Sequence, residues 1–377
     1  MIQRDLLMTI SQKAKPGKAL LLIGARQVGK TTLLHQYIDR FASDDAKVLW
    51  LNCDRQEVRD AVQTTNLHNL ELLIGSNKTV VIDEAQRVND IGLTLKLIVD
   101  NMPDVTLLVT GSSAFELRNR INEPLTGRKS TLHLFPLSTK EIYDNQGLIG
   151  VNETFESRLI YGSYPAVLLG DEPQEMLTEL ADSYLYKDIL EIDGLRRTSV
   201  LNKLVVVLAL QVGSVVSYNE LAKTVGIDRK TVEKYIDLLE KCYVVFALNS
   251  YNRNIRTELT KGKKIYFYDN GIRNAVIRNF APLEYRQDTG ALWENFFIAE
   301  RIKANRYAGR AVNSYFWRTT DKKEIDYIEE ANGHIAAFEL KWNPKKAKTT
   351  LPVSFINAYN PGETHVVTPQ NYLEYVL

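Results

Sequence analysis

The most constraining feature of the sequence is a strand, a glycine-rich loop and a helix in immediate succession. The apolar run 19–23 has the length of a buried strand. It leads into Gly24-Ala25-Arg26-Gln27-Val28-Gly29-Lys30-Thr31, which has the spacing G-x-x-x-x-G-K-[ST], and Thr32 continues into a helical pattern. The glycines let backbone N–H groups wrap phosphates, and the helix N-terminus adds partial positive charge. We therefore predict that residues 24–32 bind the phosphates of a nucleotide.

Two side chains of this loop and two carboxylates after a second strand have distinct expected roles. Lys30 is expected to reach the β- and γ-phosphates, and the Thr31 hydroxyl is expected to bind Mg²⁺. A second apolar run, 79–82, ends in Asp83 and Glu84. An acidic residue at a strand end can hold the Mg²⁺ shell, and a following carboxylate can activate the attacking water. Without the phosphate loop, two solvated carboxylates would be an equally good interpretation.

Further apolar runs predict the fold around this site. Run 105–109 ends in Thr110-Gly111-Ser112, and run 47–51 is a fourth candidate strand. Strands that alternate with helical stretches predict a parallel sheet with right-handed crossovers. Ligands bind at the carboxyl ends of such strands. If run 105–109 lies beside the first strand, its polar end lies beside the γ-phosphate.

These motifs resemble those of AAA+ ATPases from a large prokaryotic family whose C-terminal half is a domain of unknown function. The resemblance continues in segments 125–128, 135–138, 161–166 and 293–296, so it covers nearly the whole chain. It implies ATP and Mg²⁺ as cofactors, Asp83 as the magnesium-site acid, Glu84 as the catalytic base, and a sensor at Thr110 or Ser112. Arg128 resembles an arginine that acts on the γ-phosphate, in its own subunit or a neighbouring one. The alternative is a surface arginine that caps a helix.

The centre of the chain is predicted to be mainly helical. Segments 138–145 and 153–161 indicate short helices of a lid, and segment 174–190 indicates another helix. Residues 202–250 give two helices, a turn, a third helix and a strand, and 264–268 can return as its hairpin partner. This order is similar to a winged helix–turn–helix.

The charges of this winged-helix-like segment leave its role open. Its third helix, 228–241, carries four basic and four acidic side chains, which is poor for neutralising phosphates. The expected wing is more basic, with Arg253, Arg256, Lys261, Lys263 and Lys264 against Glu258. Both DNA contact and a purely structural role are therefore retained.

The last third contains carboxylates and a lysine on predicted strands. Runs 314–318, 324–328 and 334–341 read as consecutive strands, and Asn332-Gly333 is a strong hairpin-turn pair. Such a hairpin would bring Asp326 and Glu339 to one face of the sheet. Lys341 shares that face because side chains alternate along a strand.

This D…E-x-K pattern, preceded by a helical glutamate, resembles the PD-(D/E)XK fold of restriction-endonuclease-like domains. In that chemistry Asp326 and Glu339 would bind a second Mg²⁺, and Lys341 would position or activate water. Glu294 could supply a further acid from the preceding helix. A chance D…E-x-K on a hairpin is common, and such a fold can also bind nucleic acid without cutting it.

Composition narrows the classes of function. The 377 residues carry a formal net charge of +1, which does not indicate a globally basic nucleic-acid binder. The basic excess is in residues 251–377, with 19 basic and 14 acidic side chains. The two cysteines, far apart, argue against a zinc site and fit a reducing compartment. Because the apolar runs are too short to span a membrane, we expect a cytoplasmic protein without a membrane partner.

Together these features predict an α/β multidomain protein. The expected parts are a P-loop parallel AAA+ core at 1–137, a helical lid or linker at 138–200, a winged helix at 201–270 and a nuclease-like domain at 271–377. We expect Mg²⁺-dependent ATP hydrolysis in a protein that acts on, or is regulated by, DNA or another nucleic acid. An ATP-gated metal-dependent nuclease and a nucleotide-switched regulator or scaffold for protein partners are the alternatives. The AAA+ resemblance also allows a homo-oligomer.

Overall fold

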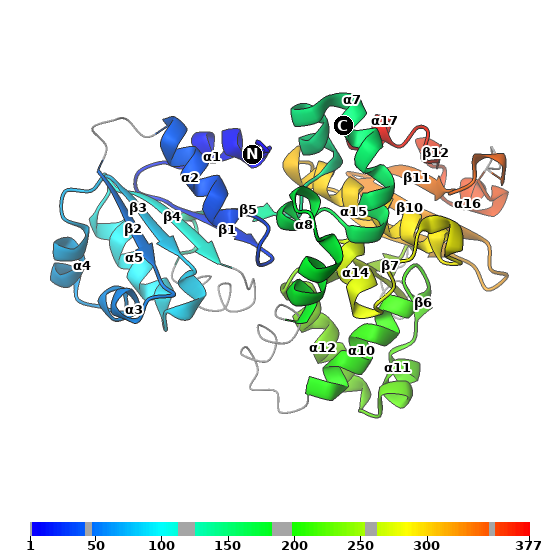
Figure 1. Ribbon diagram of the computed structural model, residues 1–377, viewed down its shortest axis with the longest axis horizontal. Coiled ribbons are helices and arrows are strands. Elements are labelled where there is room, and N and C mark those ends of the chain that lie inside the picture. Colours follow the sequence, from blue (N-terminus) through cyan, green and yellow to red (C-terminus); the bar gives the residue numbers. More distant parts are fainter. Residues whose placement is uncertain (1, 42–46, 112–124, 183–197, 253–261, 347–350) are drawn as a thin grey trace. The chain divides into compact units, whose positions relative to one another are not determined.

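The computed structural model describes residues 2–41, 47–111, 125–182, 198–252, 262–346 and 351–377 (Figure 1). The chain divides into two compact units. Unit 1 comprises Met1–Phe135 and Lys241–Tyr243, and unit 2 comprises Pro136–Glu240 and Val244–Leu377. Each unit has its own sheet, five-stranded in unit 1 and seven-stranded in unit 2.

The sheet of unit 1 is parallel throughout and has the order β2-β3-β4-β1-β5. Its strands are β1 (Ala19–Gly24), β2 (Val48–Asn52), β3 (Thr79–Asp83), β4 (Thr106–Gly111) and β5 (Lys129–Leu134). The predicted parallel sheet and its four predicted strands are confirmed, whereas β5 is an addition. Because β4 pairs with both β1 and β3, the carboxyl ends of these three strands lie side by side.

The helices of unit 1 connect its strands. They are α1 (Leu6–Lys13), α2 (Lys30–Phe41), α3 (Gln56–Val62), α4 (Leu67–Ile74), the short η1 (Ala85–Arg87) and α5 (Ile91–Asn101). Helices α1 and α2 lie against each other, and they contact β5 and β1 respectively (Figure 1). They bury Leu6, Leu7 and Ile10 from α1 and Leu33 and Leu34 from α2. This packing anchors the helix that follows the glycine-rich loop.

Unit 2 begins with the segment predicted as a lid. Helix α7 (Thr139–Tyr161) starts at Ser138, whose hydroxyl and Glu141 form a reciprocal capping box. A single non-helical residue, Gly147, interrupts α7 where two short helices were predicted. After α8 (Pro165–Leu169), residues 173–182 are helical, which agrees with the described part of the predicted helix 174–190, and the description resumes at α10 (Thr198–Leu210). Helix α7 packs against α14 (Asn270–Val276) and α15 (Thr289–Tyr307), so it is an integral part of unit 2.

Three helices and an antiparallel pair of strands follow in the predicted order. These are α10, α11 (Tyr218–Val225), α12 (Arg229–Lys241), β7 (Val245–Ser250) and β8 (Lys263–Phe267). The Ser217 hydroxyl caps α11 by accepting from Glu220 N at 3.4 Å, as the sequence predicts. Strand β8 pairs antiparallel with β7 and with the short β6 (Val215–Val216). The expected wing cations Arg253, Arg256 and Lys261 lie outside the described residues.

The rest of unit 2 is a helix, three antiparallel strands, a helix and a parallel strand. After α15 come β9 (Asn313–Arg318), β10 (Glu324–Ala331), β11 (His334–Leu340), α16 (Val353–Tyr359) and β12 (Glu363–Val367), and the chain ends in α17 (Leu373–Val376). The predicted hairpin turn is confirmed, since Asn332 and Gly333 have φ of 53° and 83° between paired strands β10 and β11. Trp317, Ile325, Ile328 and Phe355 form a buried cluster between the sheet and α16.

The turn after α7 depends on a glycine. Gly162 has φ of 75°, and a Cβ there would lie 1.9 Å from Asp269 Oδ1. That buried carboxylate accepts from Ser163 N at 2.7 Å and from Ile272 N at 3.2 Å, which caps α14. The close approach of Gly162 therefore fixes the end of α7 to the start of α14.

We expect Gly162→Ala to destabilise unit 2 strongly. At φ of 75° and ψ of −160°, a region essentially restricted to glycine, an alanine costs about 1–3 kcal/mol, and the clash with Asp269 adds about 1–3 kcal/mol. Gly309→Ala is the matched control, because Gly309 has φ of 68° and open space at its Cβ position. Urea unfolding followed by tryptophan fluorescence measures both. An equal loss of stability in the two variants would show that the Asp269 contact is unimportant.

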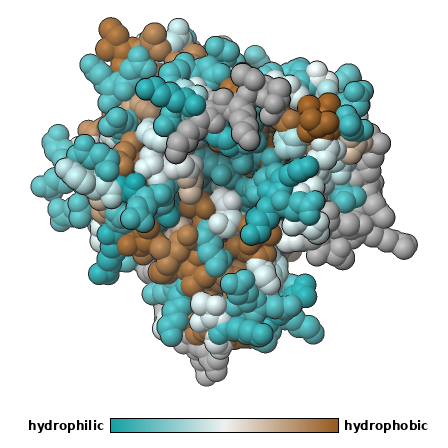
Figure 2. All heavy atoms as spheres, turned by 90° about the vertical axis from the view of Figure 1, so that its right-hand side faces the viewer, coloured by the Kyte–Doolittle hydropathy of each residue, from teal (hydrophilic) through white to brown (hydrophobic). Residues whose placement is uncertain are grey.

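The surface of unit 2 that carries α16 is of mixed polarity. Figure 2 looks onto this side and shows an apolar area surrounded by hydrophilic side chains. Among the described residues, α16 exposes Val353 and Ile356. This face is therefore not the uniformly charged surface that an extended phosphate-binding face would present. Within the described ranges, no helix is long and apolar enough to cross a membrane.

Candidate functional site

The glycine-rich loop joins the end of β1 to the start of α2. A Cβ at Gly24 would lie 2.1 Å from the Leu134 carbonyl oxygen, so only glycine allows β1 to approach β5 this closely. Gly29 has φ of 93°, a left-handed conformation that turns the chain into α2. The residues between them, Ala25, Arg26, Gln27 and Val28, form the loop, and Thr32 lies in the first turn of the helix. The predicted strand–loop–helix is thus present.

Lys30 lies over the loop that it belongs to. Its Nζ donates to the carbonyl oxygens of Gly24 at 3.1 Å and Ala25 at 2.7 Å. The side chain is 5% exposed. The Lys30 ammonium would bind an anion more strongly than it binds these two neutral carbonyls. Hydrogen bonds between charged partners are roughly twice as strong as those between neutral ones. The geometry therefore suits a phosphate that replaces these carbonyls.

Arg4 supports the same loop and was not identified from the sequence. Its guanidinium donates to the Val28 carbonyl at 2.6 Å and to the Phe135 carbonyl at 2.6 Å. The side chain is buried at the start of α1. By bonding both, Arg4 joins the loop to the end of β5. A single arginine 24 positions before its partner gives no local signal in the sequence.

Thr31, Asp83 and Thr110 meet at the carboxyl ends of β1, β3 and β4. The Thr31 hydroxyl donates to Asp83 Oδ2 at 3.0 Å, and the buried Thr110 hydroxyl donates to Asp83 Oδ1. A hydroxyl and a carboxylate are the hard oxygen ligands that Mg²⁺ prefers, and Mg²⁺ usually keeps several waters besides one or two such groups. The donor set therefore fits a magnesium ion bound with a nucleotide.

Glu84 has an uncommon backbone conformation. Its φ of 55° and ψ of 41° are left-handed, which costs about 1–3 kcal/mol for a non-glycine residue. Glu84 N donates to Thr110 Oγ1 at 3.0 Å, and Glu84 Oε2 accepts from Gln86 Nε2 at 2.5 Å. Thr110 therefore links the candidate magnesium acid to the candidate base. Ser112, the alternative sensor, lies outside the described residues.

Arg128 and the glycine-rich loop lie at opposite ends of strand β1. The Arg128 carbonyl accepts from Ala19 N at 3.0 Å, at the beginning of β1, whereas the phosphate loop follows the end of β1. Six residues of strand separate the two ends by roughly 16 Å. The Arg128 guanidinium pairs with Asp100 Oδ1 at 2.8 Å on α5. The expectation that Arg128 acts on the γ-phosphate of its own subunit is therefore not supported, and action on a neighbouring subunit stays a prediction.

A second group of ionisable side chains forms in unit 2. Strands β10 and β11 pair antiparallel, with Tyr327 opposite Phe338. Continuing this register by one residue places Asp326 opposite Glu339. Lys341 Nζ lies 2.5 Å from Glu339 Oε1 and 3.8 Å from Asp326 Oδ2, which also accepts from Leu340 N at 2.8 Å. Burial raises the pKa of Asp326 and of Glu339 above their usual values. The structure thus brings the three predicted residues together.

Lys264 lies among these carboxylates and those of Glu294 and Glu324, and we call this group the acid cluster. This position corrects the expected role of Lys264 as a wing cation that binds phosphates. Its side chain is 1% exposed, and its Nζ pairs with Glu294 Oε1 at 3.0 Å and with Glu324. Although burial lowers the pKa of Lys264, the surrounding carboxylates raise it above its usual value. Burial raises the pKa of Glu294 to about 7, even though Lys264 opposes this shift and Tyr266 donates to Glu294 at 2.6 Å. A lysine from β8 cannot bind nucleic acid while it is enclosed here.

The acid cluster does not have the arrangement of a preformed metal site. Nowhere in the described ranges do three or more His, Cys, Asp or Glu side chains converge in a way that could hold a metal ion. The carboxylates that would be ligands already have lysine partners, Lys264 and Lys341. One buried oxygen, Glu339 Oε2, has no hydrogen-bond partner. The residues predicted as a second Mg²⁺ site therefore do not fit a metal as they stand.

Comparison with protein-family models divides the chain into three matched segments. Residues 16–143 match an AAA domain. Residues 152–283 and 289–374 match two different domains of unknown function. The first match covers the α/β segment with the parallel sheet, which is therefore similar to an AAA domain. It includes the glycine-rich loop, Asp83, Glu84 and Thr110.

Similar chains occur in bacteria and archaea. An uncharacterized protein of Haemophilus influenzae is 27% identical, over 88% of this chain and 86% of its own. Uncharacterized proteins of Mycobacterium tuberculosis and Methanocaldococcus jannaschii are each 26% identical, over 90% and 87% of this chain and 74% of their own lengths. A structure of the replication initiator DnaA bound to AMPPCP and single-stranded DNA matches 63% of this chain and 86% of its own, at 17% identity and a TM-score of 0.33. A TM-score this low carries no argument about function.

Proposed function

Because residues 16–143 match an AAA domain, we propose that unit 1 binds ATP and hydrolyses it to ADP and phosphate. The observation that carries this proposal is the chain of contacts from Thr31 through Asp83 and Thr110 to Glu84. These side chains lie at one edge of the parallel sheet, where ligands bind in such folds. Magnesium held by Thr31 and Asp83 would neutralise charge on the β- and γ-phosphates.

The protein side chains account for the remaining requirements of hydrolysis. Lys30 stabilises negative charge on the γ-phosphate after it leaves its carbonyl partners. Glu84 accepts a proton from the attacking water, from its left-handed position directly after β3. Gln86 holds Glu84 Oε2 and so orients it. Phosphate release from ATP by the wild type, Lys30→Ala and Glu84→Gln tests the proposal.

We further propose that unit 2 acts on, or is regulated by, nucleic acid. The order α10, α11, α12, β7, β8 supports a winged helix–turn–helix, and the basic excess of residues 251–377 supports an anionic partner. Helix α12 is poorly suited to bind phosphates, because Arg229 on its exposed face already pairs with Glu233 at 2.9 Å. Weak dependence of nucleic-acid binding on salt would favour a scaffold for protein partners instead.

A metal-dependent nuclease in unit 2 is the second candidate function. It is favoured by the convergence of Asp326, Glu339 and Lys341 and by the helix–three-strand–helix–strand order from α15 to β12. It is opposed by Lys264, which supplies a cation to Glu294 and Glu324. Binding of nucleic acid without cleavage is therefore the proposal we prefer.

We expect no metal-dependent cleavage by the wild type, because lysines already neutralise the acid cluster. The assay incubates the full chain and Asp326→Ala with labelled single-stranded, double-stranded and branched DNA and with RNA, in Mg²⁺ or Mn²⁺. Cleavage that disappears in Asp326→Ala but persists in Lys30→Ala would contradict the expectation. That outcome would mean that unit 2 cleaves nucleic acid and does not only bind it.

A further inference from the structure

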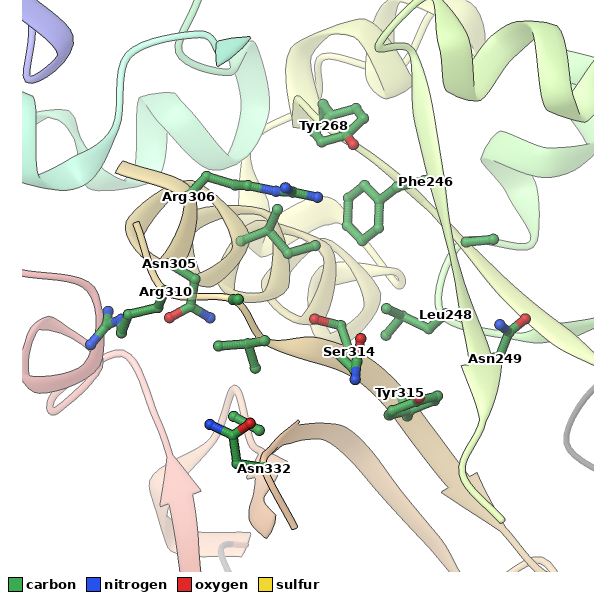
Figure 3. A pocket seen from close by; sticks show the side chains of 16 residues that line it. Phe246, Leu248, Asn249, Tyr268, Asn305, Arg306, Arg310, Ser314, Tyr315 and Asn332 are labelled. Carbon is green, nitrogen blue, oxygen red and sulfur yellow. The ribbon is translucent and has the colours of Figure 1, made fainter. Parts of the chain in front are cut away.

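A cavity of about 610 Å³ lies in unit 2, away from the acid cluster. Five parts of the fold line it, namely β7, Tyr268 directly after β8, the end of α15, the beginning of β9 and the hairpin between β10 and β11 (Figure 3). It opens because β7 and β9 pair only at Asn249–Tyr315 and Ser250–Phe316. Glu294 and Arg306 are both on α15, and their separation along the helix is about 18 Å. The cavity and the acid cluster are therefore separate sites.

The charged side chains that line this cavity are all positive. Arg306 and Arg310 line it, and neither aspartate nor glutamate does. Both arginines are exposed, and the described residues offer neither guanidinium an ion pair or hydrogen bond. Figure 3 shows the Arg306 side chain extending toward the rings of Phe246 and Tyr268. Glu330 precedes the lining residue Ala331, and the hydrogen bonds that its carboxylate accepts from Asn313 at 2.9 Å and from Gly333 N at 2.8 Å lower its pKa, so it stays negatively charged. The attraction of the cavity for an anion therefore comes from Arg306 and Arg310.

Asn305 lines the cavity and carries a buried hydrogen-bond acceptor without a partner. The residue is 5% exposed, and its Nδ2 donates to Glu329 Oε1 at 2.5 Å. Glu329 is paired with Arg301, so its carboxylate is ionised and can only accept hydrogen bonds. The atom of the Asn305 amide that contacts it must therefore be the nitrogen. Asn305 Oδ1 is left buried and without a partner. An unmade bond of this kind costs about 1–3 kcal/mol, which a ligand N–H or O–H donor would recover.

Aromatic and neutral polar groups complete the lining. The rings of Phe246 and Tyr268 lie 4.9 Å apart between centroids, tilted by 52°. Asn249, Ser314 and Asn332 supply amide and hydroxyl groups. Two cations, an acceptor and an aromatic wall match a ligand that combines a phosphate, hydrogen-bond donors and a planar ring. The volume is in the range of pockets for small ligands.

We propose that this cavity binds a nucleotide unit, with its phosphate on Arg306 and Arg310. The aromatic wall contacts the base, and Asn305 Oδ1 accepts from a donor on the base or sugar. The unit belongs either to single-stranded nucleic acid or to a free nucleotide, and both present the same chemistry. This inference deepens the proposed nucleic-acid role of unit 2, and it does not depend on ATP hydrolysis in unit 1.

The test uses the full chain carrying Lys30→Ala, which is expected to weaken nucleotide binding at the loop of unit 1. Fluorescence anisotropy measures a short labelled oligothymidine, and calorimetry measures thymidine monophosphate. The test variant adds Arg306→Gln with Arg310→Gln. The control adds Arg278→Gln with Lys322→Gln, which removes the same charge from two exposed residues of unit 2 outside the cavity. All four positions are exposed, so folding is retained.

We expect the cavity variant to lose at least about tenfold in affinity and the control less than about twofold. The slope of log affinity against log salt should become shallower by about 0.7 for each phosphate of a single strand that the protein no longer neutralises. Binding of the oligonucleotide alone identifies a strand, and binding of the mononucleotide alone identifies a free nucleotide. No binding of either, equal losses in both variants, or tighter binding of an acidic peptide would overturn the proposal. Failure of Lys30→Ala to affect ATP would instead count against unit 1 only.

Discussion

Glu84→Gln is expected to slow ATP hydrolysis by about 10²–10⁴-fold while leaving ATP affinity nearly unchanged. The amide keeps the size of the carboxylate and its hydrogen bond to Gln86, but it cannot accept a proton from water. The backbone contact between Glu84 N and Thr110 Oγ1 does not involve the side chain, so the magnesium acid stays in place. Single-turnover phosphate release measures the chemistry, and a fluorescent ATP analogue measures affinity.

A matched control for this substitution is Glu57→Gln. Glu57 is an exposed carboxylate on α3 of the same unit, and its nearest ion pair is with Arg55 at 3.7 Å. The control should hydrolyse ATP at the wild-type rate. If Glu84→Gln also hydrolyses ATP at that rate, the general base is a different residue.

Lys30→Ala is expected to weaken ATP binding by at least about 30-fold and to abolish turnover at ordinary ATP concentrations. Truncating one partner of a buried charged contact costs about 2–5 kcal/mol. Lys30 is 5% exposed, and the ammonium that this substitution removes donates to two carbonyl oxygens of the loop. Equilibrium binding of labelled ATP gives the affinity.

Lys18→Ala controls for the loss of positive charge in the same region. Lys18 is exposed and directly precedes β1, so its removal lowers the net charge equally without touching the loop. Circular dichroism should be the same for all three proteins. Equal loss of binding in both variants would mean that general attraction, and not the Lys30 contact, holds the phosphates.

The core of unit 1 was predictable because its signals are local. Strands β1, β3 and β4 are continuous apolar runs, and the glycine-rich loop has a fixed spacing. Strand β5 was missed because Lys129–Leu134 begins with three polar residues and has only two apolar ones, whereas continuous apolar runs are the usual signal of a parallel sheet. Arg4 was missed because its partners are 24 and 131 positions away.

The placement of single cations in unit 2 was less predictable. The β10–β11 hairpin follows from Asn332-Gly333, and it accounts for the meeting of Asp326 and Glu339. Lys264 reads as a surface cation because its neighbours are basic, but pairing with Glu294 and Glu324 makes its burial tolerable. Arg128 lies beside the beginning of β1, at the opposite end of that strand from the nucleotide loop. Charge patterns in a sequence do not determine which lysines and arginines are enclosed.

The most direct test of ATP hydrolysis by unit 1 is phosphate release from ATP by the purified full chain with and without Mg²⁺. The wild type should release phosphate only with Mg²⁺, and Lys30→Ala should release none above background. Equal phosphate release by the wild type and Lys30→Ala would contradict the assignment of the active site to the glycine-rich loop.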